Sequence, residues 1–229
     1  MFMWKEKLLA TFNDFSPRER DIFLRRFALD FDKSKCKKVQ LSGRELILRE
    51  ETLASVGKSF GITRERVRQL EASIEKKVKD IISIRQEVFA SLAKQADSLL
   101  NEVGGASEEN EFFFKLIGLD PAKFSQWTPE QFSERQAVFF ILRQCFALDF
   151  ERLPGSGHFY PVWKKQKLSW TDFESNLLGI EKVLAEHGSP VSEADLGGKI
   201  RASLPSGVEV KDEIINTWLA MMKKVRQNA

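Results

Sequence analysis

Residues 51–78 constrain the fold of this chain more than any other segment. Their sequence, ETLASVGKSFGITRERVRQLEASIEKKV, predicts a first helix over residues 52–60 and a tight turn at Gly61. A second helix is expected to begin after Thr63, whose hydroxyl can accept a backbone N–H that the first turn leaves without a partner. Two helices joined by so short a turn form a helix-turn-helix.

The packing between these two predicted helices follows from one glycine and a set of apolar residues. Gly57 has no side chain, so the two backbones can approach closely where the helices cross. The apolar residues expected to fill the contact are Leu53, Val56, Phe60, Ile62, Val67 and Leu70. The opposite face of the second helix is then left to polar side chains.

That polar face has the chemistry of a DNA-contacting surface. Arg64 and Arg68 stand one turn apart, and so do Glu65 and Gln69, so all four can project from one side of the helix. Arginine can donate two hydrogen bonds to guanine, glutamine can pair in the same way with adenine, and glutamate can accept from cytosine. The alternative is a solvated face of charge pairs, which leaves the preceding helix, the glycine turn and the capping threonine unexplained.

Residues 16–30, SPRERDIFLRRFALD, followed by TLASVGKSFGITRERVRQLEASIEKKVK, resemble region 4 of primary-type, sigma-70-like bacterial sigma factors. The resemblance includes the specific signature G-x-T-R-E-R-V-R-Q-x-E and covers about the first third of the chain. It implies that the helix-turn-helix contacts the promoter −35 element, with Arg64, Glu65, Arg68 and Gln69 as base-contacting residues. It also implies that the helix at 16–31 docks on the flap of the RNA polymerase β subunit.

Side chains that flank this face are expected to contact DNA phosphates. The resemblance implies such a role for Arg66 and Lys76, and the full set of candidates is Thr63, Arg66, Lys58, Lys76 and Lys77. Residues 1–85 carry 20 Lys and Arg against 13 Asp and Glu, a net charge of +7, whereas the rest of the chain is net −4. Because nonspecific affinity grows with the number of phosphates neutralised, DNA contact is expected from the N-terminal part.

Two features depart from the family pattern. The connection between Asp30 and Thr52, FDKSKCKKVQLSGRELILREE, is much longer than expected, and its VQLSGRELIL stretch predicts a short hairpin around Ser42 and Gly43. The connection also contains a basic run made of Lys33, Lys35, Lys37 and Lys38. Nothing in the remaining sequence resembles the sigma region that recognises and melts the −10 element, so this chain alone is not expected to initiate transcription.

Other function classes find little support in the sequence. His158 and His187 lie far apart without Cys or carboxylates at metal-ligand spacing, and no glycine motif fits a phosphate loop, so we expect neither an enzyme nor a cofactor. The apolar stretches are short and the N-terminus lacks the features of a signal peptide, which predicts a cytoplasmic protein without membrane contact. Cys36 and Cys145 are expected to be free thiols.

The second helix is expected to continue beyond the helix-turn-helix. No Pro or Gly occurs over residues 64–103, and apolar residues recur at helical spacing. A helix over 64–103 either breaks near Ser83, packs on the second half of the chain, or pairs with another copy to form a homodimer. We therefore expect a helix-turn-helix domain at 1–80 and a connecting helix at 81–104.

The second half of the chain is expected to be helical too. Residues 105–160 form a Phe-rich helical segment whose aromatics we assign to the core, because stacking on single-stranded nucleic acid would require a less acidic region. The stretch at 154–170 has the turn residues of a surface connector. Residues 161–229 predict a three-helix module, with Gly188 and Ser192 at helix ends, that loosely resembles a winged helix.

The sequence thus predicts an all-α protein that binds double-stranded DNA sequence-specifically, a transcription regulator contacting a −35-like site. The alternative is a protein-interaction module that binds the RNA polymerase β flap or another partner without contacting bases. The intact set of base-contacting side chains favours the DNA-binding protein.

Overall fold

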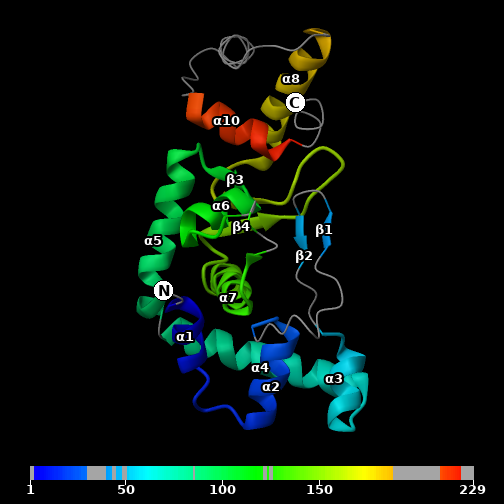
Figure 1. Cartoon of the computed structure of the whole chain (residues 1–229). Coiled ribbons are helices and arrows are strands. Elements are labelled where there is room, and N and C mark those ends of the chain that lie inside the picture. Colours follow the sequence, from blue (N-terminus) through cyan, green and yellow to red (C-terminus); the bar gives the residue numbers. More distant parts are fainter. Residues whose placement is uncertain are drawn as a thin grey trace. The chain divides into compact units, whose positions relative to one another are not determined.

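The computed structural model describes residues 3–29, 40–42, 45–47, 51–84, 86–120, 123, 126–187 and 212–222. The chain folds into two compact units, whose elements are labelled in Figure 1. The first unit contains residues 1–95 and 113–147, and the second contains residues 96–112 and 148–229. Because the two units interleave along the chain, each is assembled from segments far apart in sequence.

The described part of the first unit is helical apart from one short hairpin. Its elements are α1 (Met3–Ala10), α2 (Pro17–Arg26), β1 (Gln40–Ser42), β2 (Glu45–Ile47), α3 (Leu53–Phe60), α4 (Arg64–Ile84), most of α5 (Gln86–Glu102), the C-terminal half of α6 (Glu109–Ile117) and α7 (Pro129–Cys145). β1 and β2 pair antiparallel with Ser42 opposite Glu45, which confirms the predicted hairpin. The basic run at 33–38 lies outside the described residues.

Two helices of this unit, α2 and α7, begin with the same arrangement. The Ser16 hydroxyl accepts the backbone N–H of Glu19 at 3.3 Å, and the Glu19 carboxylate accepts that of Ser16 at 3.0 Å. Thr128 and Gln131 form the equivalent capping box at the start of α7. A proline follows the cap in both helices, where its missing N–H has no intrahelical partner to lose.

Helix α7 lies at the centre of the first unit. Most of its side chains are buried, including the charged Glu134 and Arg135. The ring of Phe140 contacts Phe23 of α2 and Phe27, the residue that caps the end of α2, edge-on, with centroids 5.1 Å and 5.0 Å away. The aromatics of the Phe-rich segment therefore include core residues, as predicted.

The predicted long helix is two helices. α4 ends at Ile84 and α5 begins at Gln86, so of the three alternatives for this stretch the break near Ser83 is the one observed. The apolar stripe along both helices is buried within the single chain, at Val67, Ile74, Val78, Ile82, Phe89, Leu92, Ala96 and Leu100. The described parts of α4 and α5 therefore leave no continuous apolar stripe for a second copy, and the homodimer through 64–103 is unsupported.

The second unit is built around a three-stranded antiparallel sheet. Its strands are β3 (Ala106–Glu108), β4 (Phe150–Leu153) and β5 (Val162–Lys165), arranged in the order β3-β5-β4. Two predictions are wrong here, because 162–165 is the central strand rather than a surface connector, and 150–153 is a strand rather than helix. β5 pairs with β3, which is distant in sequence, and with β4 across a loop. Turn residues in the local sequence do not reveal such pairings.

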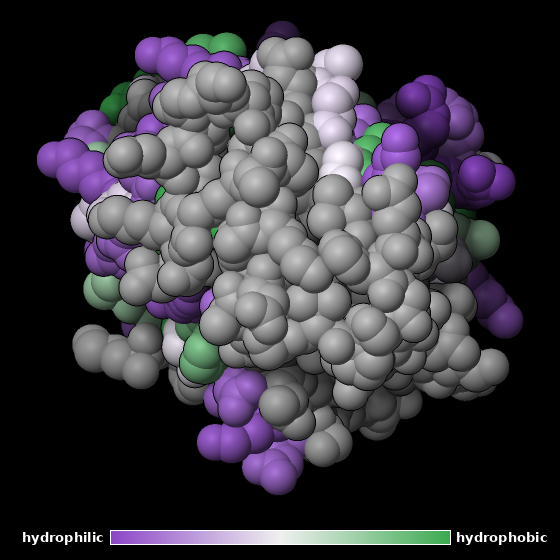
Figure 2. Space-filling view, turned by 90° about the horizontal axis from the view of Figure 1, so that it is seen from above, coloured by the Kyte–Doolittle hydropathy of each residue, from purple (hydrophilic) through white to green (hydrophobic). Residues whose placement is uncertain are grey.

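Two helices, α8 (Trp170–His187) and α10 (Asp212–Met221), contribute to the core of the second unit. Their apolar side chains form one buried cluster with the sheet, consisting of Ala106, Phe159, Val162, Phe173, Leu177, Ile215, Trp218, Met221 and Met222. Trp163 is fully buried and stacks on Phe112 with 5.9 Å between ring centroids. On the face shown in Figure 2, the described atoms are mainly hydrophilic, with small hydrophobic patches between them.

The all-α prediction is confirmed, since helices dominate the described residues and the sheets among them are small. None of the described helices is long and apolar enough to cross a membrane. The winged-helix resemblance at 161–229 stays a prediction, because Gly188 and Ser192 lie outside the described residues. The expected domain limits at 80, 104 and 160 stay predictions too.

Candidate nucleic-acid interface

The helix-turn-helix is formed by α3, the turn at Gly61, and α4. Thr52 caps α3 by accepting the Ser55 N–H at 3.1 Å, and α3 ends at Gly61 with a φ of 65°, a left-handed conformation that glycine adopts without steric cost. A Cβ at Gly57 would lie 2.7 Å from the carbonyl oxygen of Ile62. The close approach predicted for Gly57 is therefore confirmed.

The first turn of α4 is fixed by Thr63. Its hydroxyl accepts the backbone N–H of Arg66 at 3.1 Å, as predicted for a capping threonine. Val67, one residue further along the helix, is fully buried. With the cap and this buried residue in place, the orientation of the exposed side of α4 is determined.

The four predicted base-contacting side chains lie on that exposed side. Arg64, Glu65, Arg68 and Gln69 are all exposed, and they occupy the first two turns of α4. In helix-turn-helix proteins these N-terminal residues of the second helix contact base edges in the major groove. The structure therefore brings the predicted residues together on one accessible surface.

Within this surface the side chains pair with one another. Arg68 donates to the Glu65 carboxylate through Nη2 at 2.7 Å and through Nε at 2.9 Å, and Arg66 donates to the Gln69 amide oxygen at 3.2 Å. The hydrogen bond from Arg68 lowers the pKa of Glu65, and the same bond raises the pKa of Arg68. Both groups thus stay ionised at neutral pH, so one can accept from a base while the other donates.

The side chains predicted to contact phosphates differ in whether they form an ion pair within the protein. Lys58, Arg66 and Lys76 are exposed. Lys77 is exposed too, but it forms an ion pair with Glu19 of α2 at 2.5 Å, which lowers the pKa of that carboxyl. Any phosphate contact by Lys77 would have to compete with this pair.

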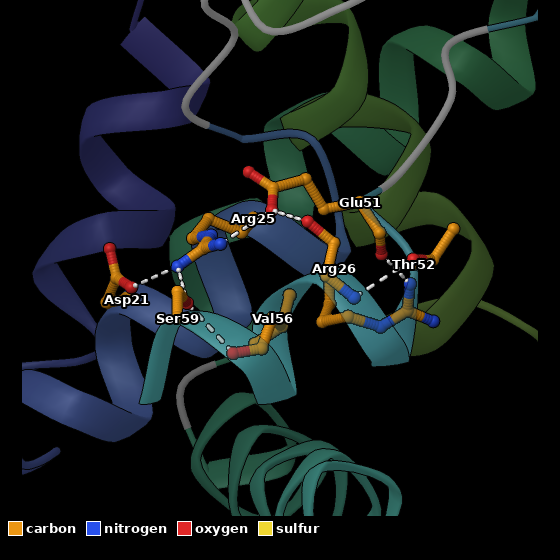
Figure 3. Close-up of polar contacts among 8 residues, drawn as sticks. Asp21, Arg25, Arg26, Glu51, Thr52, Val56 and Ser59 are labelled. Atoms are coloured by element: carbon orange, nitrogen blue, oxygen red, sulfur yellow. Dashed lines mark hydrogen bonds and ion pairs between the residues drawn. The ribbon is translucent and has the colours of Figure 1, made fainter. Parts of the chain in front are cut away.

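A network of hydrogen bonds joins the end of α2 to the start of α3 (Figure 3). Arg25 donates to the Glu51 carboxylate at 2.6 Å and to the Ser59 hydroxyl at 2.8 Å, and it pairs with Asp21 at 3.3 Å. The Glu51 N–H in turn donates to the Arg25 carbonyl at 3.2 Å. The chain therefore leaves α2 and returns to α3 at nearly the same place.

The adjacent Arg26 extends this network to α4. Its guanidinium donates to the Glu51 carbonyl and forms an ion pair with Glu71 at 3.0 Å, and both side chains of the pair are mostly buried. Arg26, at the end of α2, thus contacts Glu51, which precedes α3 on the other side of the long connection, and Glu71 of α4, the helix with the candidate DNA surface. These contacts hold α2, α3 and α4 together even though the connection between α2 and α3 is long.

Sequence reasoning missed the residues of this network. Arg25, Arg26, Glu51 and Glu71 have opposite charges on either side of the insertion, which is the only local signal of their pairing. It predicted burial for the aromatics around Phe140 but missed the contacts of Phe140 with Phe23 and Phe27, which join segments more than a hundred positions apart. Among the described residues, no group of three His, Cys, Asp or Glu side chains is placed to hold a metal ion.

Comparison with known proteins points to the same segment. Residues 12–80 match the family model described as Sigma-70, region 4. A stretch of 77 residues is 36% identical to the RNA polymerase sigma factor SigA of Clostridium acetobutylicum. The aligned stretch covers 34% of this chain and only 16% of that relative. No solved structure matches the chain.

The matched residues are those that build the candidate surface. They include α2, α3 and nearly all of α4, together with the network that joins them. Residues 12–80 are therefore a segment of the sigma-70 region 4 type.

Proposed function

We propose that this chain is a sequence-specific double-stranded DNA-binding protein that regulates transcription in the cytoplasm by contacting a −35-like site through α4. The observation that carries this proposal is the exposed set of Arg64, Glu65, Arg68 and Gln69 on a correctly capped second helix. Such side chains provide both donors and acceptors for base edges. Similarity to a sigma factor over residues 12–80 supports the same surface.

The proposed contact places the first two turns of α4 in the major groove. Arg64 and Arg68 donate to guanine, and Glu65 and Gln69 contact cytosine or adenine. Because Glu65 and Arg68 are paired in the free protein, they can contact neighbouring bases as a unit. Lys58, Arg66 and Lys76 hold the register of the helix through phosphates, with Thr63 at the helix start and Lys77 once released from Glu19.

A second candidate function is binding to the RNA polymerase β flap without base contact. It is favoured by one observation, that the network around Glu51 keeps α2 against α3 despite the long insertion. The exposed side of α2, which includes Arg18 and Arg20, is then available to a protein partner. DNA binding remains the preferred function because the polar surface of α4 would serve no purpose in flap binding alone.

Selection of DNA sites from a random pool by the full chain tests the proposal. We expect an enriched motif that resembles a −35 hexamer, bound through α4. Arg68→Ala should weaken binding to the best site by about 1 to 3 kcal/mol while changing binding to random DNA little. Lys94→Ala, which removes an exposed cation of α5, is the matched control and should leave both unchanged.

The two candidate functions give opposite results in this experiment. No enriched motif, combined with binding of the chain to isolated β flap, would establish the second function instead. An equal loss for Arg68→Ala on the selected site and on random DNA would show that Arg68 contacts phosphate rather than a base.

A further inference from the structure

A cavity of about 180 Å³ lies in the second unit, between the loop that joins β4 to β5 and the start of α8. Every residue around it belongs to that unit. Its lining includes Pro154, Phe159, Tyr160, Trp170 and Glu174. Pockets for drug-sized ligands begin at roughly 300 Å³, so this cavity suits a single side chain or a group of similar size.

Aromatic residues make up much of the lining. The rings of Phe159 and Trp170 are nearly perpendicular, with an interplanar angle of 87° and 6.0 Å between their centroids. Tyr160 adds a third ring from the same loop as Phe159. The face of an aromatic ring is negative, and a cation within about 6 Å of the ring centre is attracted to it. A small cavity lined in this way therefore favours a positively charged group.

The lining also contains a carboxylate, that of Glu174. This side chain is half-buried, and no ion pair joins it to another residue in the part of the chain that the structure describes. Two other glutamates of the unit are paired, since Glu181 lies 3.4 Å from Nδ1 of His158 and Glu109 forms an ion pair with Arg152. Because a half-buried charge is stabilised by a charge of opposite sign, Glu174 favours a cation supplied from outside.

The loop that forms one side of the cavity is held in place by its own hydrogen bonds. The Ser156 hydroxyl accepts the backbone N–H groups of His158 and Phe159, each at 3.2 Å, and the Ser156 N–H donates to the Phe159 carbonyl at 2.9 Å. The Tyr160 N–H donates to the Met221 carbonyl at 2.9 Å. The rings are therefore positioned before a ligand binds, which reduces the entropy lost on binding.

The surface next to the cavity continues along α8. Trp170, Glu174, Leu178 and Glu181 follow one another at spacings of four, four and three residues, so they share one side of the helix. Leu178 is 40% exposed, which is unusual for a large apolar side chain in this unit. A free small cation would contact only the cavity, whereas a protein segment can also cover Leu178.

We propose that this cavity binds a Lys or Arg side chain of a partner protein, and that a neighbouring apolar residue of the partner covers Leu178. The cation lies among the rings of the cavity and pairs with Glu174. The net charge of −4 on residues 86–229 attracts such a basic partner. This interaction surface belongs to the second unit and is independent of the proposed function of α4.

The test is a tryptophan fluorescence titration of the full chain with three blocked dipeptides. Acetyl-Lys-Leu-amide and acetyl-Arg-Leu-amide carry the cation, and acetyl-norleucyl-Leu-amide replaces the ammonium group of lysine by a methyl group. We expect the Kd of at least one cationic dipeptide to be about fivefold or more below that of the norleucine dipeptide.

Two variants locate the cation. Glu174→Gln keeps the shape of the side chain and should raise the Kd of the cationic dipeptide about fivefold without changing that of the norleucine dipeptide. Asp149→Asn is the matched control, because it removes an exposed carboxylate of the same unit that does not line the cavity. Thermal unfolding checks that both variants fold.

Butylammonium, which has the charged end of lysine alone, separates a protein partner from a free small cation. Leu178→Ser should raise the Kd of the cationic dipeptide about threefold and leave that of butylammonium unchanged. Butylammonium binding as tightly as the dipeptides would overturn the partner and make the ligand a free alkylammonium ion. Equal binding of the norleucine dipeptide, no effect of Glu174→Gln, or no saturable binding of either cationic dipeptide would overturn the cation site itself.

Discussion

The Glu134 carboxylate on α7 caps the first turn of α1 by accepting the N–H of Trp4 at 2.8 Å, across 130 positions of sequence. It accepts the Lys5 N–H at the same distance. The unpaired N–H groups of a helix N-terminus favour a negative charge, and here the charge comes from a different helix. The unit that carries the region 4 segment is therefore completed by residues far beyond that segment.

Removing the Glu134 carboxylate should destabilise the first unit. Glu134→Ala leaves the buried N–H of Trp4 and the partly buried N–H of Lys5 without this acceptor, and we expect it to lower the free energy of unfolding by about 2 to 4 kcal/mol. Glu134→Gln keeps one acceptor oxygen and should cost less. Urea unfolding of the three proteins measures the series, and equal stability of wild type and Glu134→Ala would contradict the capping role.

Gly57 is expected to tolerate no side chain. Gly57→Ala places a methyl group 2.7 Å from the Ile62 carbonyl oxygen, which should cost about 1 to 3 kcal/mol and weaken specific DNA binding. Gly179 in α8 is the matched control, because a Cβ there meets nothing within 4 Å. Gly179→Ala should be neutral or stabilising by up to about 1 kcal/mol, since alanine favours helix.

These two substitutions are compared by thermal unfolding and DNA titration. If Gly57→Ala melted at the wild-type temperature and bound the selected site normally, the close crossing of α3 and α4 would be refuted.

The Arg26 network should matter for both stability and DNA binding. Arg26→Ala removes the contacts with Glu51 and Glu71, and the loss of charged hydrogen bonds in this mostly buried position should cost about 2 kcal/mol. Arg20→Ala, on the exposed side of the same helix, should change stability by less than about 0.5 kcal/mol. Calorimetry tests both, and equal effects would show that the network contributes nothing specific.

The second unit should lose stability as the pH rises towards neutrality. Burial raises the pKa of Glu108 from an ordinary value of 4.5 to about 7, and one of its oxygens has no hydrogen-bond partner among the described residues. The folded chain therefore binds a proton that the unfolded chain has released between these values. Stability is fully present below about pH 4.5 and decreases up to about pH 7.

A comparison with Glu108→Gln isolates this contribution. Wild type should lose about 1 to 3 kcal/mol relative to the variant between pH 5 and pH 8, at about 1.4 kcal/mol for each unit of pKa difference. Urea unfolding followed by tryptophan fluorescence measures both. Parallel pH profiles for the two proteins would mean that Glu108 is not a buried titrating group.

The helix-turn-helix could be predicted from sequence because its signals are local. The caps at Thr52 and Thr63, the left-handed Gly61 and the crossing at Gly57 each depend on a few neighbouring residues. The exposure of Arg68 follows from the burial of Val67 beside it. A pattern of this kind specifies its own geometry wherever it lies in a chain.

The second half could not be predicted in the same way. Val162 and Trp163 become a central strand only because β3 and β4 supply hydrogen-bond partners on both sides. Helical spacing of Phe residues predicts burial without naming the partner, so the contact between Phe140 and Phe23 was invisible. Pairings such as Arg26 with Glu71 depend on the same long-range contacts.

The hydrogen bond between Glu51 and Arg25 has a practical consequence for the length of the connection between these two residues. Its N–H is bonded to the Arg25 carbonyl, so the segment between them starts and ends within one hydrogen bond of the same point. The entropy of closing a loop grows only with the logarithm of its length, about 0.6 kcal/mol for each doubling. We therefore expect that lengthening this segment, for example by inserting a folded reporter domain into it, adds little closure entropy and leaves the helix-turn-helix in place.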